Sequence, residues 1–211
     1  GLMISEFPWI AYSVIKEFAS DIWDGFHVFL IPFTFLKDQV LGIKIAGTFL
    51  TATLLIILYW SLAKLKVSKK YFWPFLALFA APNVLFHFAM TRPHILSTAF
   101  AILLFAFLAR GGIIGVFLTS FLSSFAHLGL FWMVLVVFGV TALAKFFAEK
   151  KFDWQNGIAV AAGLVAGWLL RPNPIGAVKI AYVQIIKLLL EKQKGTPLTF
   201  GREIFPLEWE T

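Results

Sequence analysis

The feature that most constrains this chain is a series of long apolar runs. The run GIKIAGTFLTATLLIILYWSLAKL at 42–65 exceeds the about 20 residues that a helix needs to cross a hydrocarbon layer. A soluble core requires no such runs. The chain is 60% hydrophobic and 14% charged, with a mean hydropathy of +0.87, whereas soluble domains are about half apolar and roughly a quarter charged. We therefore predict an all-α, polytopic transmembrane helix bundle.

The bundle is expected to contain about six or seven membrane segments, broken at proline and glycine. The predicted spans are 39–63, 71–90, 94–109, 111–126, 128–147 and 155–170, and 25–36 is a short apolar segment. Several are short, which tilt or burial against neighbours would allow. Three regions follow. Residues 1–38 form an extracytoplasmic or interfacial segment with a short apolar or re-entrant helix, 39–175 form the transmembrane bundle, and 176–211 form an extracytoplasmic interfacial helix and loop.

The net charge of +7 indicates orientation rather than a nucleic-acid partner. The basic residues gather in short connections that strict alternation of the spans places on one face: Lys64, Lys66, Lys69, Lys70, Arg110, Lys145, Lys150 and Lys151. The positive-inside bias makes that face cytoplasmic, so the four histidines fall on the outer face. We predict a multi-pass protein of the cell membrane, of the bacterial inner-membrane type. The sequence has no cysteine, which excludes thiolate chemistry.

The stretch FASDIWDGFH at 18–27 places two carboxylates and a histidine at the outer face. In a helix, Asp24 and His27 share a face, so a carboxylate can orient or act with an imidazole. Ionisable groups at the membrane edge are costly, which favours a functional interpretation. An alternative stays open, in which Asp21 caps a helix and Trp23 anchors in the interfacial belt.

The stretch MTRPHILSTAF at 90–100 interrupts the apolar sequence with an arginine, a proline and a histidine. Pro93 disfavours helix at Arg92 and fits the first turn of a new span. Arg92 can therefore hold a phosphate by forked hydrogen bonds, assisted by the positive end of the following helix. The alternative is that Arg92 snorkels to lipid headgroups. His94 lies beside it without an assigned role.

Two further turns carry polar residues to the outer face. FAHLGLF at 125–131 contains His127, and LLRPNPIG at 169–176 contains Arg171 and Asn173. A lone histidine of this kind is more often a packing residue than a ligand, and the second turn is also explained as a helix stop. Four outward histidines raise the question of metal or haem, but their spacings match no compact ligand pattern, and we predict no metal site.

Taken in order, the motifs FPWIAYS, WDGFHVFLIPFTFLKD, TRPHILS, AHLG and NPIG resemble the landmarks of multi-pass bacterial glycosyltransferases of the GT-C type. In this family an arginine-proline pair opens a mid-chain helix, a His-Gly-like turn follows, and an Asn-Pro-aromatic-Gly turn ends a later span. Arg92-Pro93, His127 with Gly129, and the turn at 173–176 occupy those places, with Ile175 instead of the aromatic residue. The family has a further span upstream, so we interpret the chain as a piece of a longer protein.

The resemblance implies an enzyme that transfers a sugar from a polyprenyl-phosphate carrier on the extracytoplasmic side. It makes Asp24 or Asp21 the base that activates the acceptor, and it makes Arg92, with Arg171 second, a contact of the donor phosphate. Further site candidates are His27, His94, His127 and Asn173. The cofactor is open, although Mg²⁺ or Mn²⁺ would suit carboxylates near a phosphate. The implied partners are membrane lipid, the lipid-linked sugar, and a partner protein or the rest of a longer chain.

The residues leave two other functions open. One is a non-catalytic membrane subunit that binds lipid or a partner protein through its aromatic faces, with the polar turns only shaping the bundle. The other, less favoured, is a histidine-ligated metal or haem protein.

Overall fold

The computed structural model describes residues 20–80 and 90–195, and every regular element in these ranges is a helix. The α-helices are α1 (Asp24–Leu30), α2 (Gln39–Lys64), α3 (Phe72–Phe79), α5 (Pro93–Arg110), α6 (Ile113–Ala126), α7 (Phe131–Glu149), α8 (Trp154–Leu169), α9 (Pro174–Tyr182) and α10 (Leu188–Gln193). Short 3-10 segments lie at Ile31–Phe35 (η3) and Leu128–Leu130 (η4), and a π-helical segment (η5) lies at Val183–Lys187. The predicted all-α class is therefore confirmed.

In the described part of the chain, three helical segments are long and apolar enough to cross a membrane, which indicates a membrane protein. They are Gln39–Lys64, Pro93–Arg110 and Leu128–Glu149. A fourth is added if Trp154–Leu169 and Pro174–Gln193, which meet at 105°, count as one bent span. Within residues 20–80 and 90–195, the predicted count of six or seven is not confirmed. The segment 25–36 folds as α1 and η3, helix α6 has 14 residues, and most of the predicted span 71–90 beyond α3 lies outside the described residues.

Local sequence signals explain where several helices begin and end. The Asp38 carboxylate caps α2, accepting hydrogen bonds from the N–H groups of Val40 (2.9 Å) and Leu41 (3.1 Å). Pro93 and Pro174 open α5 and α9, where the missing N–H of proline costs nothing. Helix α7 stops at Lys150, which adopts a left-handed conformation with φ of 57°.

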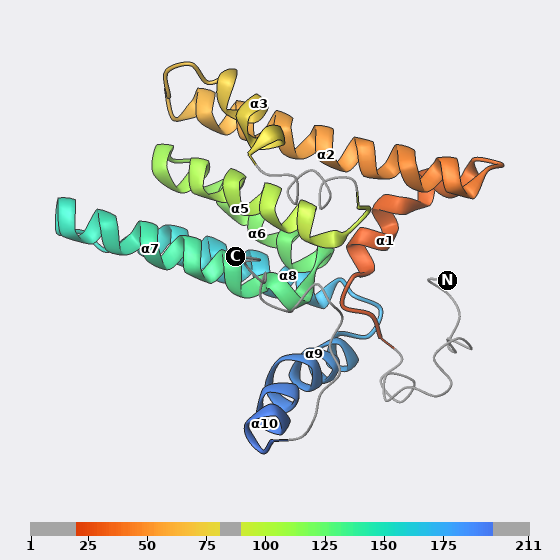
Figure 1. The fold of residues 1–211 in the computed structure, drawn as a ribbon. Helices are drawn as coiled ribbons and strands as arrows, with labels where there is room; N and C mark the ends of the chain where they lie inside the picture. The colour runs from red at the N-terminus through yellow and green to blue at the C-terminus, as the bar shows by residue number, and fades with distance from the viewer. Residues whose placement is uncertain (1–19, 81–89, 196–211) are drawn as a thin grey trace, which may run out of the picture.

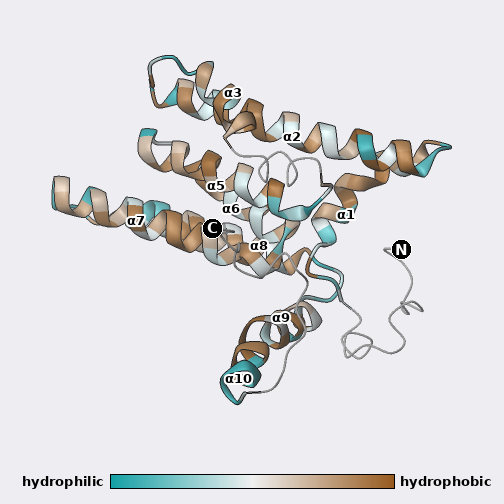
Figure 2. Ribbon diagram, in the orientation of Figure 1, coloured by the Kyte–Doolittle hydropathy of each residue, from teal (hydrophilic) through white to brown (hydrophobic). Residues whose placement is uncertain are grey.

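The bundle has two distinct ends. Helices α2 and α5 run in the same direction, since the Thr91 hydroxyl donates to the Ile43 carbonyl (3.0 Å) near their starts, and Arg110 donates to the Leu65 carbonyl (2.8 Å) near their ends. Helix α7 runs with them and packs against α5, while α6 and α8 run in the opposite direction, and α8 lies behind α7 in the view of Figure 1. The connections after α2, α5 and α7 thus lie together, and Figure 2 shows hydrophilic residues there. We call residues 64–70, 110 and 145–153 the basic end. Its cytoplasmic placement stays a prediction.

Helices α6 and α8 form the closest-packed pair of the bundle. A Cβ atom at Gly163 would lie 2.5 Å from the Phe117 carbonyl oxygen, and one at Gly167 would clash with the Phe121 carbonyl. Small residues at this spacing let two helix backbones approach closely, as they do between transmembrane helices. The interior between α5, α6, α7 and α8 is filled by Leu104, Leu108, Val116, Val134, Ala159 and Val160. The α6–α8 pair therefore fixes the position of the residues at its two ends.

Candidate functional site

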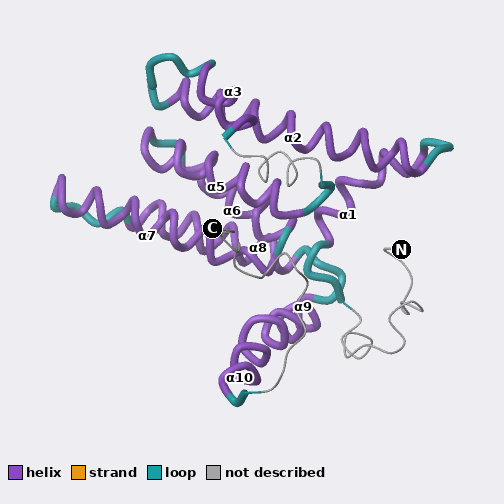
Figure 3. The backbone as a smooth tube through the Cα atoms, viewed as in Figure 1, coloured by secondary structure: helices purple, strands orange, loops and turns teal. Residues whose placement is uncertain are grey.

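The end of the bundle opposite the basic end gathers polar residues from distant parts of the chain, and we call it the site end. It comprises residues 20–27, the start of α5, the end of α6 with η4, and the α8–α9 junction at 170–173. Figure 3 shows the loop before α1 beside the loop between α8 and α9. The Ser20 hydroxyl donates to the Asn173 carbonyl (3.1 Å) across 153 positions of sequence.

Arg171 lies at the centre of the site end, and its side chain is fully buried. One terminal nitrogen donates to the Asp21 carbonyl (2.9 Å) and to the Asp24 carboxylate (3.1 Å). The other donates to the carbonyls of Ile22 (3.3 Å), Ser124 (2.6 Å) and Phe125 (2.9 Å). The guanidinium therefore joins the segment before α1 to the end of α6. We call this arrangement the Arg171 clasp.

The clasp bears on two of the predicted roles. Arg171 was a second candidate for the donor phosphate, but both of its terminal nitrogens already bind protein oxygens, and Nε is buried without a partner among the described residues. Asp24 was a candidate base, yet its carboxylate contacts the buried guanidinium. Burial raises the pKa of Asp24, against the opposing positive charge of Arg171. Both residues are placed to hold the site together rather than to face a substrate.

Asp21 and His27 form a second, more exposed pair. The Asp21 carboxylate lies 2.6 Å from His27 Nδ1 and also accepts the Trp23 N–H at 2.9 Å. The side chains are 20% and 46% exposed. Burial alone would raise the pKa of Asp21, but the hydrogen bonds from His27 and Trp23 lower it, and the bond to Asp21 raises the pKa of His27. The pair is an ionised carboxylate that orients an accessible imidazole. The sequence spacing predicted Asp24, rather than Asp21, as the partner of His27.

His127 lies deeper in the same end. Its Nδ1 is 3.3 Å from the Ser97 hydroxyl at the start of α5, and its ring is 6.2 Å from the Trp23 ring. Burial, followed by the charges of His94 and Arg171, lowers the pKa of His127 to about 4. His127 is therefore neutral at ordinary pH. Its contacts agree with the packing role that the sequence left open. Because the charge of His94 acts on His127, His94 lies at the same end.

The remaining predicted residues lie at the same end with different roles. The Asn173 side chain caps α9 by accepting the Gly176 N–H at 2.9 Å, as expected of a turn that starts a helix. Arg92 is the N-cap residue of α5, with an extended backbone and no side-chain capping bond. Its predicted contact with a phosphate stays a prediction.

Sequence reasoning did not single out Ser97, Ser20 or the carbonyls at the end of α6. Main-chain oxygens carry no residue-specific signal, so only the fold could reveal that the carbonyls of Ser124 and Phe125 face Arg171. Serines in an apolar helix such as α5 and α6 did offer a signal, because buried hydroxyls need partners.

The site end does not suit a divalent ion. Asp24 contacts Arg171, and the Asp21 oxygens contact His27 and the Trp23 amide. Across residues 20–80 and 90–195, no three His, Asp or Glu side chains come together in a way that could hold a metal ion. The suggestion of Mg²⁺ or Mn²⁺, and the metal or haem alternative, therefore gain no support from these residues, and no chemical step is routed through a metal.

The site end thus combines a buried arginine clasp, a partly exposed aspartate–histidine pair and a neutral histidine. These groups place a proton acceptor, the His27 imidazole, at one end of the helix bundle. No protein-family model matches the chain, and neither a curated protein nor a solved structure matches it.

Proposed function

We propose that this chain acts as a GT-C-type membrane glycosyltransferase that takes a sugar from a polyprenyl-phosphate carrier at the site end. The observation that carries the proposal is the Asp21–His27 pair, 2.6 Å apart and partly exposed, at one end of an apolar helix bundle. An acid–base pair in that position suits the activation of an acceptor hydroxyl. The substrate class comes from the motif order in the sequence.

In the proposed reaction, Asp21 orients His27 through Nδ1 and leaves the second ring nitrogen, Nε2, for the acceptor. Nε2 removes the hydroxyl proton as the acceptor oxygen bonds to the anomeric carbon of the sugar. The bond from that carbon to the phosphate oxygen breaks, and polyprenyl phosphate leaves with the electron pair. The hydrogen bond to Asp21 raises the pKa of His27, which makes its imidazole a stronger proton acceptor.

Arg92 is assigned the donor phosphate in this proposal. It precedes Pro93 at the first turn of α5, and the positive end of the helix dipole favours an anion there. Helix α5 starts at the site end, because its Ser97 contacts His127. The Arg171 clasp holds the residue 21–24 segment in place behind the reacting groups.

The test uses proteoliposomes with the purified chain, undecaprenyl-phosphate hexoses radiolabelled in the sugar, and a membrane extract as the source of acceptor. Transfer of label out of the organic phase is measured. We expect Asp21→Asn and His27→Gln each to lower the rate by about 10²-fold or more, and Arg92→Ala to raise KM for the donor. Asp153→Asn is the matched control, because it removes an ion-paired aspartate at the basic end. Wild-type rates in folded Asp21→Asn and His27→Gln would contradict the proposal.

The alternative of a non-catalytic membrane subunit is favoured by a separate observation, an apolar cavity of about 560 Å³ at the edge of the bundle. If the wild-type chain transfers no hexose from any labelled donor, this alternative replaces the transferase.

A further inference from the structure

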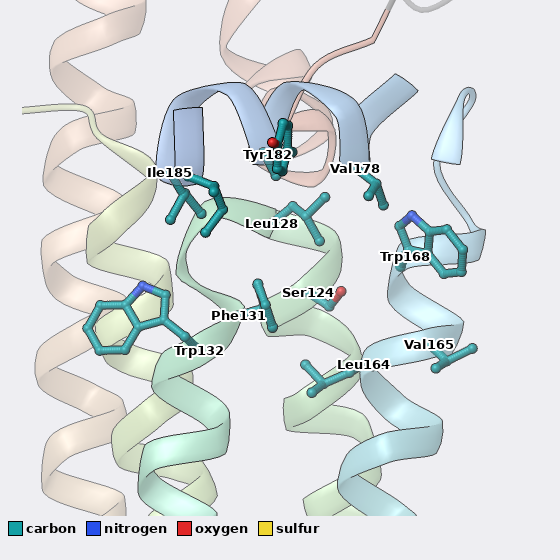
Figure 4. Close-up of a pocket in the computed structure, with 12 residues that line it drawn as sticks. Ser124, Leu128, Phe131, Trp132, Leu164, Val165, Trp168, Val178, Tyr182 and Ile185 are labelled. Atoms are coloured by element: carbon teal, nitrogen blue, oxygen red, sulfur yellow. The ribbon is translucent and has the colours of Figure 1, made fainter. Parts of the chain in front are cut away.

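An apolar groove lies beneath α9 and η5, on the side of the bundle formed by α7 and α8. Figure 4 shows Tyr182 and Ile185 above it, Trp132 and Trp168 at opposite sides, and Val165 along α8. The cavity measures about 560 Å³, and nearly all of its lining is apolar. The groove is not closed, since Trp132, Val165 and Tyr182 keep about half of their surfaces exposed (49%, 49% and 53%).

The groove lies within reach of the hydrocarbon layer. Helix α7, which forms one wall, belongs to a candidate membrane span, and its outward face carries exposed Leu135, Val136 and Val140. Side chains of this kind face lipid in a membrane protein. The groove therefore opens sideways, toward membrane lipid.

The size of the cavity argues against a helix as its occupant. An α-helix 10–12 Å wide fills roughly 420–610 Å³ for each turn, so about 560 Å³ would accept about one turn. A single unbranched hydrocarbon chain is much narrower than a helix, so a longer stretch of it fits the same volume.

A buried layer separates the groove from the Asp21–His27 pair. Ile22, Leu128, Ala177 and Ile180 form a core cluster there, with Trp168 packed against it. The Leu128 N–H donates to the Ile22 carbonyl at 2.9 Å and closes the layer. The lipid that occupies the groove is therefore inferred from the charge and shape of the groove itself.

The roof of the groove carries positive charge. Lys179 and Lys187 are exposed and directly follow the lining residues Val178 and Ile186. They therefore lie on the flank of the same helical segment, where long basic side chains reach a phosphate at the membrane surface. Charge and shape together match a lipid with one chain in the groove and an anionic headgroup above it.

We propose that the groove binds one acyl chain of an anionic phospholipid, with the headgroup phosphate held by Lys179 and Lys187. The site serves to fasten α9 and η5 to the bundle and does not depend on the proposed transferase activity. Lipid binding and sugar transfer have separate readouts, so either can fail alone.

The test is photo-crosslinking in nanodiscs of phosphatidylcholine that contain phosphatidylglycerol with a diazirine in one acyl chain. We expect labelled peptides from α8 and α9, including Val165 and Tyr182. Ala181→Trp fills the groove and should lower this labelling by about tenfold, a loss of roughly 1.4 kcal/mol in affinity. Val140→Trp is the control, because it adds the same side chain to the exposed face of α7 and should leave the labelling of the groove unchanged. If Ala181→Trp does not fold, Val178→Trp provides the same test from the groove edge.

The double variant Lys179→Glu with Lys187→Glu tests the headgroup. It should lower labelling by phosphatidylglycerol and leave labelling by an equivalent phosphatidylcholine probe unchanged. Equal labelling of the groove and of the α7 face around Val140 would overturn the proposal. So would displacement of the probe by undecaprenyl phosphate at lower concentration than by phosphatidylglycerol, because the groove would then hold a polyprenyl chain.

Discussion

A lysine–aspartate pair at the basic end and an arginine–aspartate pair at the site end differ in their surroundings. At the basic end, Lys145 Nζ lies 2.7 Å from Asp153, and both side chains are partly exposed (28% and 17%). At the site end, Arg171 lies 3.1 Å from Asp24, with exposures of 0% and 11%. The longer contact is the more important one, because Arg171 also binds carbonyl oxygens from two segments. Burial and the number of partners, more than distance, decide what an ion pair does.

The largest expected effect is on the clasp. Arg171→Gln would leave Asp24 and several buried carbonyls without a partner, and removing one member of a buried pair costs about 3–5 kcal/mol. The free energy of unfolding, measured by titration with SDS in mixed micelles, checks this. Arg171→Lys keeps the charge but loses the forked hydrogen bonds of the guanidinium, so its free energy of unfolding should lie between those of the wild type and Arg171→Gln. A loss below about 1 kcal/mol for Arg171→Gln would show that the clasp contributes no more than a surface pair.

A smaller effect is expected from pH, and only at the site end. The pKa of His127 is about 4 in the fold and 6.5 in the unfolded chain. Between these values the unfolded chain binds the proton and the folded chain does not, so the stability that His127 provides above pH 6.5 is lost as pH falls toward 4. The raised pKa of His27 and the lowered pKa of Asp21 leave their own contributions in place across that window. The raised pKa of Asp24 acts in the opposite direction, because the folded chain takes up this proton more readily as pH falls, and it offsets part of the loss.

Thermal unfolding in detergent between pH 4 and 7 measures this dependence. His127→Gln keeps a hydrogen-bonding side chain beside Ser97 and should flatten the profile. An unchanged profile in this variant would mean that another group causes the pH dependence.

The smallest effect is expected at the basic end. Lys145→Gln removes one partner of Asp153, but the carboxylate keeps hydrogen bonds from Asn156 (3.0 and 2.9 Å). Exposed pairs contribute about 0–1 kcal/mol, so the free energy of unfolding should change little. The same SDS titration measures it. A loss as large as that of Arg171→Gln would remove the distinction between the two ends.

Much of the fold could be predicted because apolar helices carry their own signal. The predicted spans 39–63 and 94–109 correspond closely to α2 and α5, and Pro93 and Pro174 start helices as turn chemistry requires. The number of crossings was less predictable. Continuous apolar sequence does not distinguish a spanning helix from a short one packed against neighbours, as α6 is against α8.

The site was predictable in its residues but not in their pairings. Asp21, Asp24, His27, His127, Arg171 and Asn173 all lie at one end, as the alternation of spans indicated. The spacing of Asp24 and His27 suggested that they act together, yet His27 contacts Asp21 and Asp24 contacts Arg171. Residue 21 lies before the first turn of α1, where helical spacing does not apply.

The sequence by itself determined that the chain is helical and apolar enough for a membrane, because backbone groups in hydrocarbon must be satisfied within helices. It also placed the polar turns at opposite ends. Only the tertiary structure decided that Arg171 is enclosed by carbonyls from the α1 and α6 segments. Those oxygens belong to the main chain, and their approach depends on how closely α6 and α8 pack at Gly163 and Gly167. That packing turns an arginine of apparent phosphate-binding character into the residue that holds the site together.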